Sequence, residues 1–346
     1  MKKLIDTGNG MDQLNADVVM LEEKKPDIDS VFDLCAQEMS EINSLIRNSL
    51  DSNVVLIRQI AEYIIGSGGK RLRPMLVILA THASGYRGGQ HINLAAIIEF
   101  IHTATLLHDD VVDESDLRRG KESAHAVWGN AASVLVGDFL YSRSFQMMVG
   151  IDSMRLMEVL SDATNTIAEG EVEQLLNMHD PEISQESYFS VIEKKTAKLF
   201  EAACQLGAVL AGRPELEPAM AEFGRELGAA FQVTDDVLDY MSDAETLGKN
   251  SGDDLAEGKP TLPLILCREQ ADEKSRRLID ESIHQGDREQ LDRIVAMIRD
   301  GGALEQAMQL ARGRAGAALA ALDSLAPSTW KDAMETLAHY SVTRDY

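Results

Sequence analysis

Cysteines, basic residues and long apolar runs are all scarce in this chain, and each scarcity argues against a class of protein. The three cysteines, Cys35, Cys204 and Cys267, lie far apart in the 346 residues and form no CxxC pair. Their spacing argues against a disulfide framework and against a zinc site, and it indicates reduced thiols in a cytosolic compartment. No apolar run approaches the roughly 18 residues that cross a bilayer. We therefore expect no transmembrane segment.

The charge balance is strongly acidic, with 33 Lys and Arg against 57 Asp and Glu and a formal net charge of -24. Such a surplus of negative charge predicts that no nucleic acid is bound. An acidic protein that binds an anionic substrate must gather its few basic residues in one place. The N-terminus starts with two lysines, but no apolar segment follows, so it is not a signal peptide. We expect residues 1–25 to be a flexible extension and the protein to be cytoplasmic.

Strand patterns are absent as well, because no alternating β-branched segments are bounded by hairpin turns. Instead, apolar residues recur at helical spacing in stretches rich in Ala, Leu, Glu, Gln and Met, and Gly or Pro falls between these stretches. No shift in composition divides the chain. We predict an all-α fold, a single large helical bundle over residues 26–346. The expected helices cover residues 31–49, 54–65, 76–83, 94–107, 131–148, 154–178, 187–211 and 219–240, and most of the C-terminal third.

The stretch at residues 94–107 is apolar around most of its circumference, which predicts a buried central helix. It runs directly into an acidic motif at residues 109–113. A helix that is apolar along its length and anionic at its C-terminal end indicates a deep central apolar cavity with a metal site at its mouth.

Two copies of one acidic motif, Asp-Asp-x-x-Asp, carry the most information about chemistry. The aspartates are Asp109, Asp110 and Asp113 in the first copy, and Asp235, Asp236 and Asp239 in the second. On a helix the first and last aspartate share a face, so we expect Asp109, Asp113, Asp235 and Asp239 to be metal ligands. Oxygen ligands of this kind suit Mg²⁺, which also binds substrate phosphates. One copy alone could be the solvent-exposed face of a helix. Two copies in apolar sequence favour a site that binds a diphosphate from both sides.

Basic residues form two short clusters that could bind phosphate. Lys70 and Arg73 follow a Gly-Gly turn, where side-chain cations and backbone N–H groups can meet a phosphate. The alternative is an ordinary basic helix start. The spacing of the glycines does not fit a Walker A loop. Arg118 and Arg119 follow the first acidic motif closely, and they either neutralise its aspartates or bind the same phosphate.

A histidine precedes the first motif on the same helix face. His102 lies seven residues before Asp109, two helical turns away. It is either a core residue or a hydrogen-bond donor to the diphosphate. His108 beside Asp109 would suit a metal phosphohydrolase, but that interpretation leaves the second acidic motif without a role.

The motifs, in this order, resemble the trans-polyprenyl diphosphate synthases over residues 28–346. The segments that carry the resemblance are residues 69–74, His102, and residues 109–120, 195–196, 231–239 and 248–263. Residues 129–138 are most similar to the bacterial octaprenyl diphosphate synthases of that family. The resemblance implies an isoprenoid synthase fold, a homodimer, and two or three Mg²⁺ ions per site. A terpene cyclase would not need a second diphosphate site, and a non-catalytic subunit typically lacks the aspartate motifs.

The family's reaction is the stepwise head-to-tail addition of isopentenyl diphosphate to an allylic diphosphate, here farnesyl diphosphate. The resemblance implies that the six motif aspartates, Lys195 and Lys259 are catalytic. The substrate-binding residues that it implies are Lys70, Arg73, His102, Arg118, Arg119, Lys195, Thr196, Gln232, Lys249 and Lys259.

In this family the fifth residue before the first motif often forms the floor of the product tunnel. That residue is Ala104, and Ile101 lies one turn deeper. A small side chain would leave the tunnel open, so we expect a long product, octaprenyl diphosphate for quinone side chains. Heptaprenyl, nonaprenyl and decaprenyl products stay open as alternatives. Release of so apolar a product would bring the protein transiently to a membrane.

Overall fold

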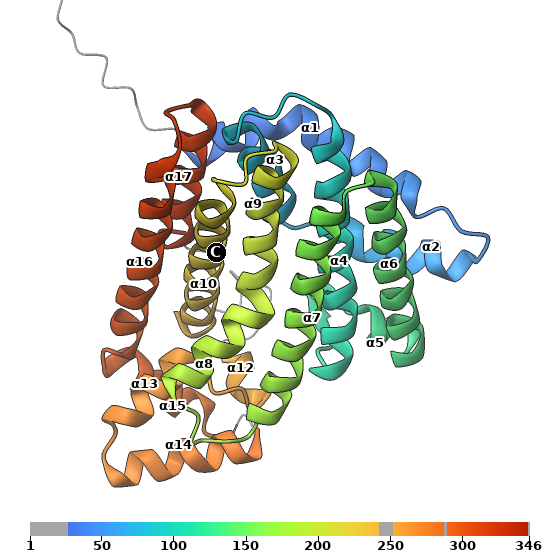
Figure 1. Ribbon diagram of the computed structural model, residues 1–346. Coiled ribbons are helices and arrows are strands. Elements are labelled where there is room, and N and C mark those ends of the chain that lie inside the picture. Colours follow the sequence, from blue (N-terminus) through green and yellow to red (C-terminus); the bar gives the residue numbers. More distant parts are fainter. Residues whose placement is uncertain (1–26, 242–251, 287–288, 345–346) are drawn as a thin grey trace, which may run out of the picture.

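The computed structural model describes residues 27–241, 252–286 and 289–344. Within these ranges the chain is helical apart from its connecting loops and one short hairpin (Figure 1). This confirms the predicted all-α class. The expected N-terminal extension and Lys249 lie outside the described residues.

The helices match the predicted ranges to within a few residues, except that the stretch at 187–211 is divided into three. The elements are α1 (Ile28–Ser49), α2 (Val55–Gly66), α3 (Leu72–Ala83), α4 (Gln90–Val112), β1 (Leu117–Arg118), β2 (Lys121–Glu122), α5 (Ala124–Trp128), α6 (Asn130–Ile151), α7 (Met154–Asn177), α8 (Gln185–Ile192), η1 (Glu193–Ala197), α9 (Lys198–Leu210), α10 (Glu217–Met241), α12 (Asp253–Ala256), α13 (Leu262–Gln270), α14 (Glu273–Gln285), α15 (Leu291–Asp300), α16 (Ala303–Ala321), η2 (Leu322–Ser324) and α17 (Thr329–Ser341).

Helix α4 is the central element, as its apolar circumference predicts. It packs against α1, α3, α6 and α9, and Phe100 and Ile101 near its middle are completely buried. A second apolar cluster joins α10 to α13, α15 and α16 around Tyr240 and Ile294. In Figure 1, α13 and α15 lie at the lower left, below α10 and α16. Helix α10 belongs to both clusters, since Leu227 packs in the first and Val237 in the second.

A polar contact ties four helices at the opposite end of α4. Glu38 on α1 accepts hydrogen bonds from Nε2 of His82 on α3 at 2.8 Å and from Nε2 of His91 on α4 at 2.7 Å. The His82 ring stacks on Trp330 of α17, with 4.3 Å between ring centroids. Because one carboxylate oxygen serves both imidazoles, α1 is held in register with α3 and α4.

The hairpin of β1 and β2 was not expected from the sequence. Leu117 pairs with Glu122, and the two-residue turn between the strands has φ of 53° at Arg119 and 72° at Gly120. Positive φ at both turn positions is the conformation that tight hairpins favour. Strands of two residues are too short to show an alternating pattern, so they cannot be predicted from periodicity.

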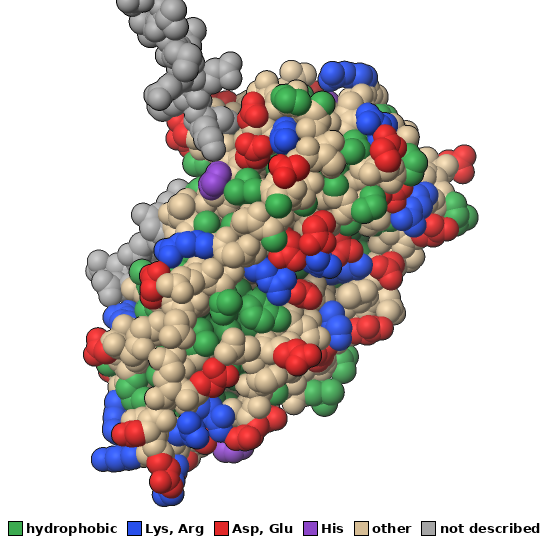
Figure 2. Space-filling model, turned by 60° about the vertical axis from the view of Figure 1, so that its left-hand side comes forward, with side chains coloured by type: hydrophobic (Ala, Val, Ile, Leu, Met, Phe, Trp, Pro, Cys, Tyr) green, Lys and Arg blue, Asp and Glu red, His purple; other side chains and the backbone are tan. Residues whose placement is uncertain are grey.

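No helix in the part of the chain that the structure describes is long and apolar enough to span a membrane. On the face drawn in Figure 2, acidic and basic side chains are interspersed, and hydrophobic side chains show between them.

Candidate active site

A cavity of about 890 Å³ opens where α4, α7, η1 and α10 converge. Its volume is in the range of small-molecule sites. Unlike the protein as a whole, its wall is nearly balanced in charge. The basic lining residues are Lys70, Arg71, Arg73, Arg118, Arg119, Lys195, Lys259 and Arg344, and the acidic ones are Glu99, Asp109, Asp113, Glu171, Asp235, Asp236 and Asp254. The chain therefore gathers basic residues locally, as an anionic substrate requires.

The first acidic motif divides its aspartates between two roles. Asp109 and Asp113 line the cavity, as the predicted shared helix face requires. Asp110 is completely buried, and its Oδ1 accepts from Nε of Arg118 at 2.7 Å and pairs with Nη2 at 2.6 Å. Burial raises the pKa of Asp109, and the charge of Lys195 opposes that shift. The middle aspartate thus fixes Arg118, while the outer two present oxygens to the cavity.

Two lysines neutralise carboxylates on this wall. Lys259 Nζ lies 2.7 Å from Asp113 and 2.7 Å from Glu257. Burial by itself would lower the pKa of Lys259, but the charges of Asp113 and Glu257 outweigh burial and raise it. Lys195 Nζ lies 2.6 Å from Glu171. Burial, with a smaller contribution from Asp109, raises the pKa of Glu171 to about 7. Glu171 is a site residue that the motifs did not indicate.

The side chains of the second acidic motif lie only in part where the sequence predicts them. Asp235 and Asp236 line the cavity, whereas Asp239 is not among the lining residues. Asp236 is buried and accepts hydrogen bonds from the Tyr188 hydroxyl and from Nε2 of Gln232, the latter at 2.8 Å. Asp239 lies one turn further along α10, where its backbone oxygen accepts from Gly252 N at 3.1 Å. A ligand role for Asp239 therefore stays a prediction.

Lys195 and Thr196 reach the cavity from a π-helical turn, η1, between α8 and α9. Such turns are frequent at functional sites because they displace side chains from the regular helical register. Thr196 Oγ1 donates to Oε1 of Gln232 at 2.9 Å. Glycines let neighbouring helices approach the turn: a Cβ at Gly170 would lie 2.7 Å from Lys195 N. The sequence pattern predicted one helix here and missed the turn.

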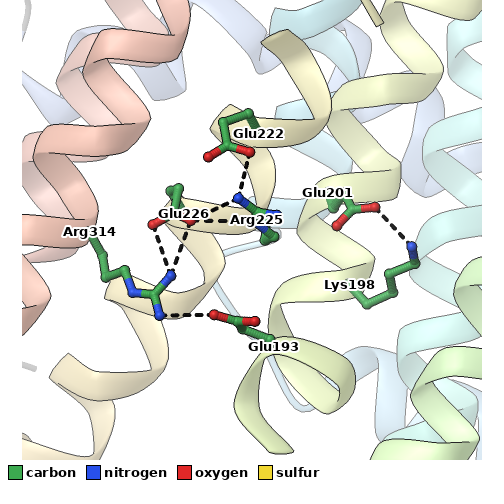
Figure 3. A network of polar contacts seen from close by, with 7 residues as sticks. All are labelled: Glu193, Lys198, Glu201, Glu222, Arg225, Glu226 and Arg314. Carbon is green, nitrogen blue, oxygen red and sulfur yellow. Dashed lines mark hydrogen bonds and ion pairs between the residues drawn. The ribbon is translucent and has the colours of Figure 1, made fainter. Parts of the chain in front are cut away.

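An ion-pair network holds the outer side of this turn (Figure 3). Arg314 on α16 lies 2.9 Å from Glu193 in η1 and 3.1 Å from Glu226 on α10. Glu226 is only 4 % exposed, so its charge is costly without a cation. The network joins η1 to the two helices behind it and keeps the turn that carries Lys195 in place.

The Gly-rich turn before α3 forms a cationic cradle with the hairpin. Arg119 Nη1 donates to Gly68 O. Gly69 has φ of 129°, which favours glycine, and a Cβ there would lie 2.7 Å from that guanidinium and would displace it. Arg71 has φ of 50° and pairs with the buried carboxylate of Glu99. Arg71 and Glu99 were missed from the sequence, although Arg71 lies inside the basic motif.

Arg73 and His102 meet beneath this cradle. Arg73 Nη1 donates to His102 Nε2 at 3.2 Å, and the Arg73 guanidinium lies over the Phe200 ring at 4.6 Å. Burial lowers the pKa of Arg73 to about 10. Burial and the nearby arginines lower the pKa of His102 well below its ordinary value, so the imidazole is neutral. Arg73 Nε is buried and has no hydrogen-bond partner among the described residues, which leaves a donor for an anion.

Arg344 is a further site residue that no motif indicated. It follows α17 and enters the cavity wall, with Nη2 2.5 Å from Asp235 Oδ1 and 2.9 Å from Phe231 O. Its guanidinium lies over the Phe231 ring at 3.9 Å. The C-terminal segment thereby contacts the second acidic motif, which only the folded chain reveals.

The expected floor residues do not line the cavity. Ala104 and Ile101 are completely buried, and α4 contributes His102, Thr105 and Leu106 to the wall instead. One turn after Ala104, His108 contacts Val134 O of α6 at 3.2 Å, so this side of α4 faces α6. The predicted tunnel floor at Ala104 is therefore not a surface of the cavity that the structure shows.

Comparison with known proteins agrees with this site. The family model described as "Polyprenyl synthetase" matches residues 54–299, and the chain belongs to that family. It is 51% identical over 320 residues to octaprenyl diphosphate synthase of Escherichia coli (strain K12), covering 92% of this chain and 99% of that protein. It is 48% identical to the enzyme of the same name from Haemophilus influenzae, covering 92% and 98%.

Solved structures give the same result. A polyprenyl synthase from Caulobacter crescentus CB15, complexed with calcium and isoprenyl diphosphate, matches with a TM-score of 0.90 and 44% identity, covering 93% of this chain and 99% of that one. The family uses divalent metal ions. The chain is thus a prenyltransferase of isoprenoid biosynthesis. Within that class, it is a long-chain trans-prenyl diphosphate synthase.

Proposed function

We propose that the enzyme extends farnesyl diphosphate with isopentenyl diphosphate in the presence of Mg²⁺, and that its product is octaprenyl diphosphate. The observation that carries this proposal is the division of one cavity into a carboxylate wall at Asp109 and Asp113 and a cationic cradle at residues 68–73. Each half suits one diphosphate, one through metal ions and one through direct ion pairs. The relatives named octaprenyl diphosphate synthase support the product length.

The carboxylate wall would hold the metal and the allylic diphosphate. Asp109, Asp113 and Asp235 offer oxygen ligands, the donor set that Mg²⁺ prefers, and Asp239 would complete it. Mg²⁺ supplies Lewis acidity to the leaving diphosphate. Lys195 and Lys259 carry fixed positive charge on the same wall and offset the charge that develops as the carbon–oxygen bond breaks.

The cradle would hold isopentenyl diphosphate. Lys70, Arg73 and Arg119 supply cationic donors, and neutral His102 adds a hydrogen-bond partner without further charge. Bound there, the double bond of isopentenyl diphosphate attacks the allylic cation, and a proton is lost to the departing diphosphate. The chemistry requires no protein nucleophile. Gln232 and Thr196 orient one another beside Asp236 and keep the second motif in register.

The test is incubation of the purified enzyme with farnesyl diphosphate, labelled isopentenyl diphosphate and Mg²⁺, followed by product-length analysis. Products that end at the octaprenyl length support the proposal. A ladder that ends at a shorter or longer chain keeps the class and refutes the product. No incorporation by a folded protein would favour a non-catalytic subunit that needs a partner.

We further propose a homodimer that associates through α6. Leu135 and Val149 on this helix are 66% and 63% exposed, and Phe145 is 36% exposed. An exposed apolar row on one helix favours association, because its burial removes apolar area from water. Light scattering coupled to gel filtration measures the mass directly, and a monomer at micromolar concentration would refute the dimer.

The enzyme is proposed to act in the cytoplasm and to contact a membrane transiently when its apolar product leaves. Flotation with phospholipid vesicles, with and without turnover, tests this. Equal recovery in both conditions would count against product-coupled association.

A further inference from the structure

The segment that carries Lys259 meets the end of α7 at His179. His179 lies just beyond the last residue of α7, and its backbone N–H donates to Gly258 O at 2.8 Å. Gly258 immediately precedes Lys259, whose ammonium group pairs with Asp113. The position of the Lys259 backbone is thus tied to an element that is distant in sequence.

The imidazole of His179 makes a second connection. Its Nδ1 lies 3.1 Å from Ile283 O on α14. Since a carbonyl oxygen can only accept, Nδ1 carries the proton. The ring also packs closely on two glycines: a Cβ at Gly258 would lie 2.3 Å from Nδ1, and one at Gly286 would lie 2.8 Å from Cε1. One side chain therefore contacts both the Lys259 segment and the end of α14.

The backbone of His179 adopts a strained conformation to make these contacts. Its φ is 62°, in the left-handed region that costs a non-glycine residue roughly 1–2 kcal/mol. Such strain persists only where the surroundings hold it in place. Here the positive φ lets the backbone N–H of His179 point toward Gly258 O while the imidazole reaches the backbone oxygen of Ile283.

We propose that His179 is a positioning residue for Lys259. It fixes the Gly258 peptide and so determines where the Lys259 ammonium group lies against Asp113 at the diphosphate site. His179 does not line the cavity within the described residues, and it acts through Gly258. Three other backbone hydrogen bonds hold the segment, Gly258 N to Leu255 O at 2.9 Å, Lys259 N to Asp254 O at 2.8 Å and Thr261 N to Lys259 O at 3.0 Å. All three lie within residues 254–261, whereas the bond from His179 joins the segment to the end of α7. This inference rests on the proposed role of Lys259.

The first test compares His179→Asn with His179→Val. Asparagine tolerates the left-handed conformation and keeps an N–H donor, so we expect kcat within about threefold of wild type. Valine is β-branched and disfavours that conformation. We expect it to lower kcat about tenfold through misplacement of Lys259, with the KM for isopentenyl diphosphate nearly unchanged, since the cradle at residues 68–73 lies on other elements.

A matched control separates positioning from general destabilisation. Asp152, at the end of α6, has a similar φ of 55° and is exposed. Asp152→Val therefore imposes a comparable backbone cost away from Lys259, and we expect it to lower Tm without changing kcat. If His179→Val keeps the wild-type kcat while it lowers Tm like the control, the positioning role is wrong. Lys259→Ala tests the underlying role independently, because wild-type activity there would refute Lys259 as a catalytic residue whatever His179 does.

A suppressor pair covers the outcome in which His179→Val fails to fold. Gly258→Ala places a methyl group against the imidazole at 2.3 Å, and we expect it to lower kcat about tenfold. His179→Gly keeps the backbone conformation and removes the ring. The double variant should therefore recover part of the loss from Gly258→Ala. Effects that simply add, with no recovery, would overturn the proposed contact.

Discussion

Replacement of Asp110 and of Asp109 by asparagine should separate two functions that one motif combines. Asp110 is completely buried against Arg118, with N–O distances of 2.7 and 2.6 Å. Asp109 faces the cavity, and burial raises its pKa. We therefore expect Asp110→Asn to destabilise the fold and to release Arg118, and Asp109→Asn to remove a metal ligand with no loss of stability.

The magnitude follows from the contacts of Asp110. Breaking a buried ion pair costs about 3–5 kcal/mol, but asparagine keeps the shape and one acceptor for Arg118, so we expect a loss of about 2–3 kcal/mol. Unfolding entropy is about 2.1 cal/mol/K per residue, so for a chain of this length the loss lowers Tm by about 3–4 °C. Asp109→Asn should leave Tm unchanged or raise it, because its ionised carboxylate is disfavoured in the folded state.

Thermal denaturation and Mg²⁺ titration of activity provide the two readouts. Both variants should lose kcat, but only Asp109→Asn should raise the Mg²⁺ concentration that gives half-maximal rate. Wild-type Tm for Asp110→Asn together with a lowered Tm for Asp109→Asn would refute this assignment of roles.

Three further predictions concern single residues. Ala104→Tyr should shorten the products if the floor model holds, and overpacking at this buried site should cost about 1–3 kcal/mol; unchanged product length, measured by chromatography, would rule the model out. Arg344→Ala removes the cation beside Asp235, and we expect kcat/KM to fall about tenfold, or about 1.4 kcal/mol, in steady-state assays. Burial raises the pKa of Glu171 in the folded protein to about 7. The protonated carboxyl group therefore stabilises the fold fully at pH values below the pKa of the unfolded state, and this stabilisation is lost as the pH rises through about 7. Glutamine does not titrate, so the Tm of Glu171→Gln minus that of wild type should rise between about pH 5 and pH 8. A Tm difference that stays constant over this range would contradict the raised pKa of Glu171.

The sequence was most informative where regular periodicity carried the signal. The apolar circumference of α4 predicted a central helix, and its buried residues confirm this. The four-residue spacing of Asp109 and Asp113 predicted that they share a helix face, and both line the cavity. A helical pattern also fixes which side chains point together, so this part of the site follows from spacing alone.

Features that depend on tertiary contacts left no such signal. Arg344 reaches Asp235 only because α17 packs beside α10, and no local motif marks it. The π-helical turn at η1 arises within an otherwise ordinary helical pattern. Ala104 does not line the cavity, so its role in setting product length stays a prediction that only product analysis of variants can test.

The two buried lysines explain how a wall of carboxylates can accept an anion. Without them, Asp109 and Glu171 would be still harder to ionise, because burial already raises the pKa of both carboxyl groups. Lys195 and Lys259 pair with Glu171 and Asp113, so this part of the wall stays nearly neutral. We expect that a divalent cation bound at Asp113 would compete with Lys259 for the same carboxylate oxygens. The displaced ammonium group of Lys259 would then have its charge available to a diphosphate oxygen, so the pair that stabilises the free enzyme would also supply a cation to the substrate.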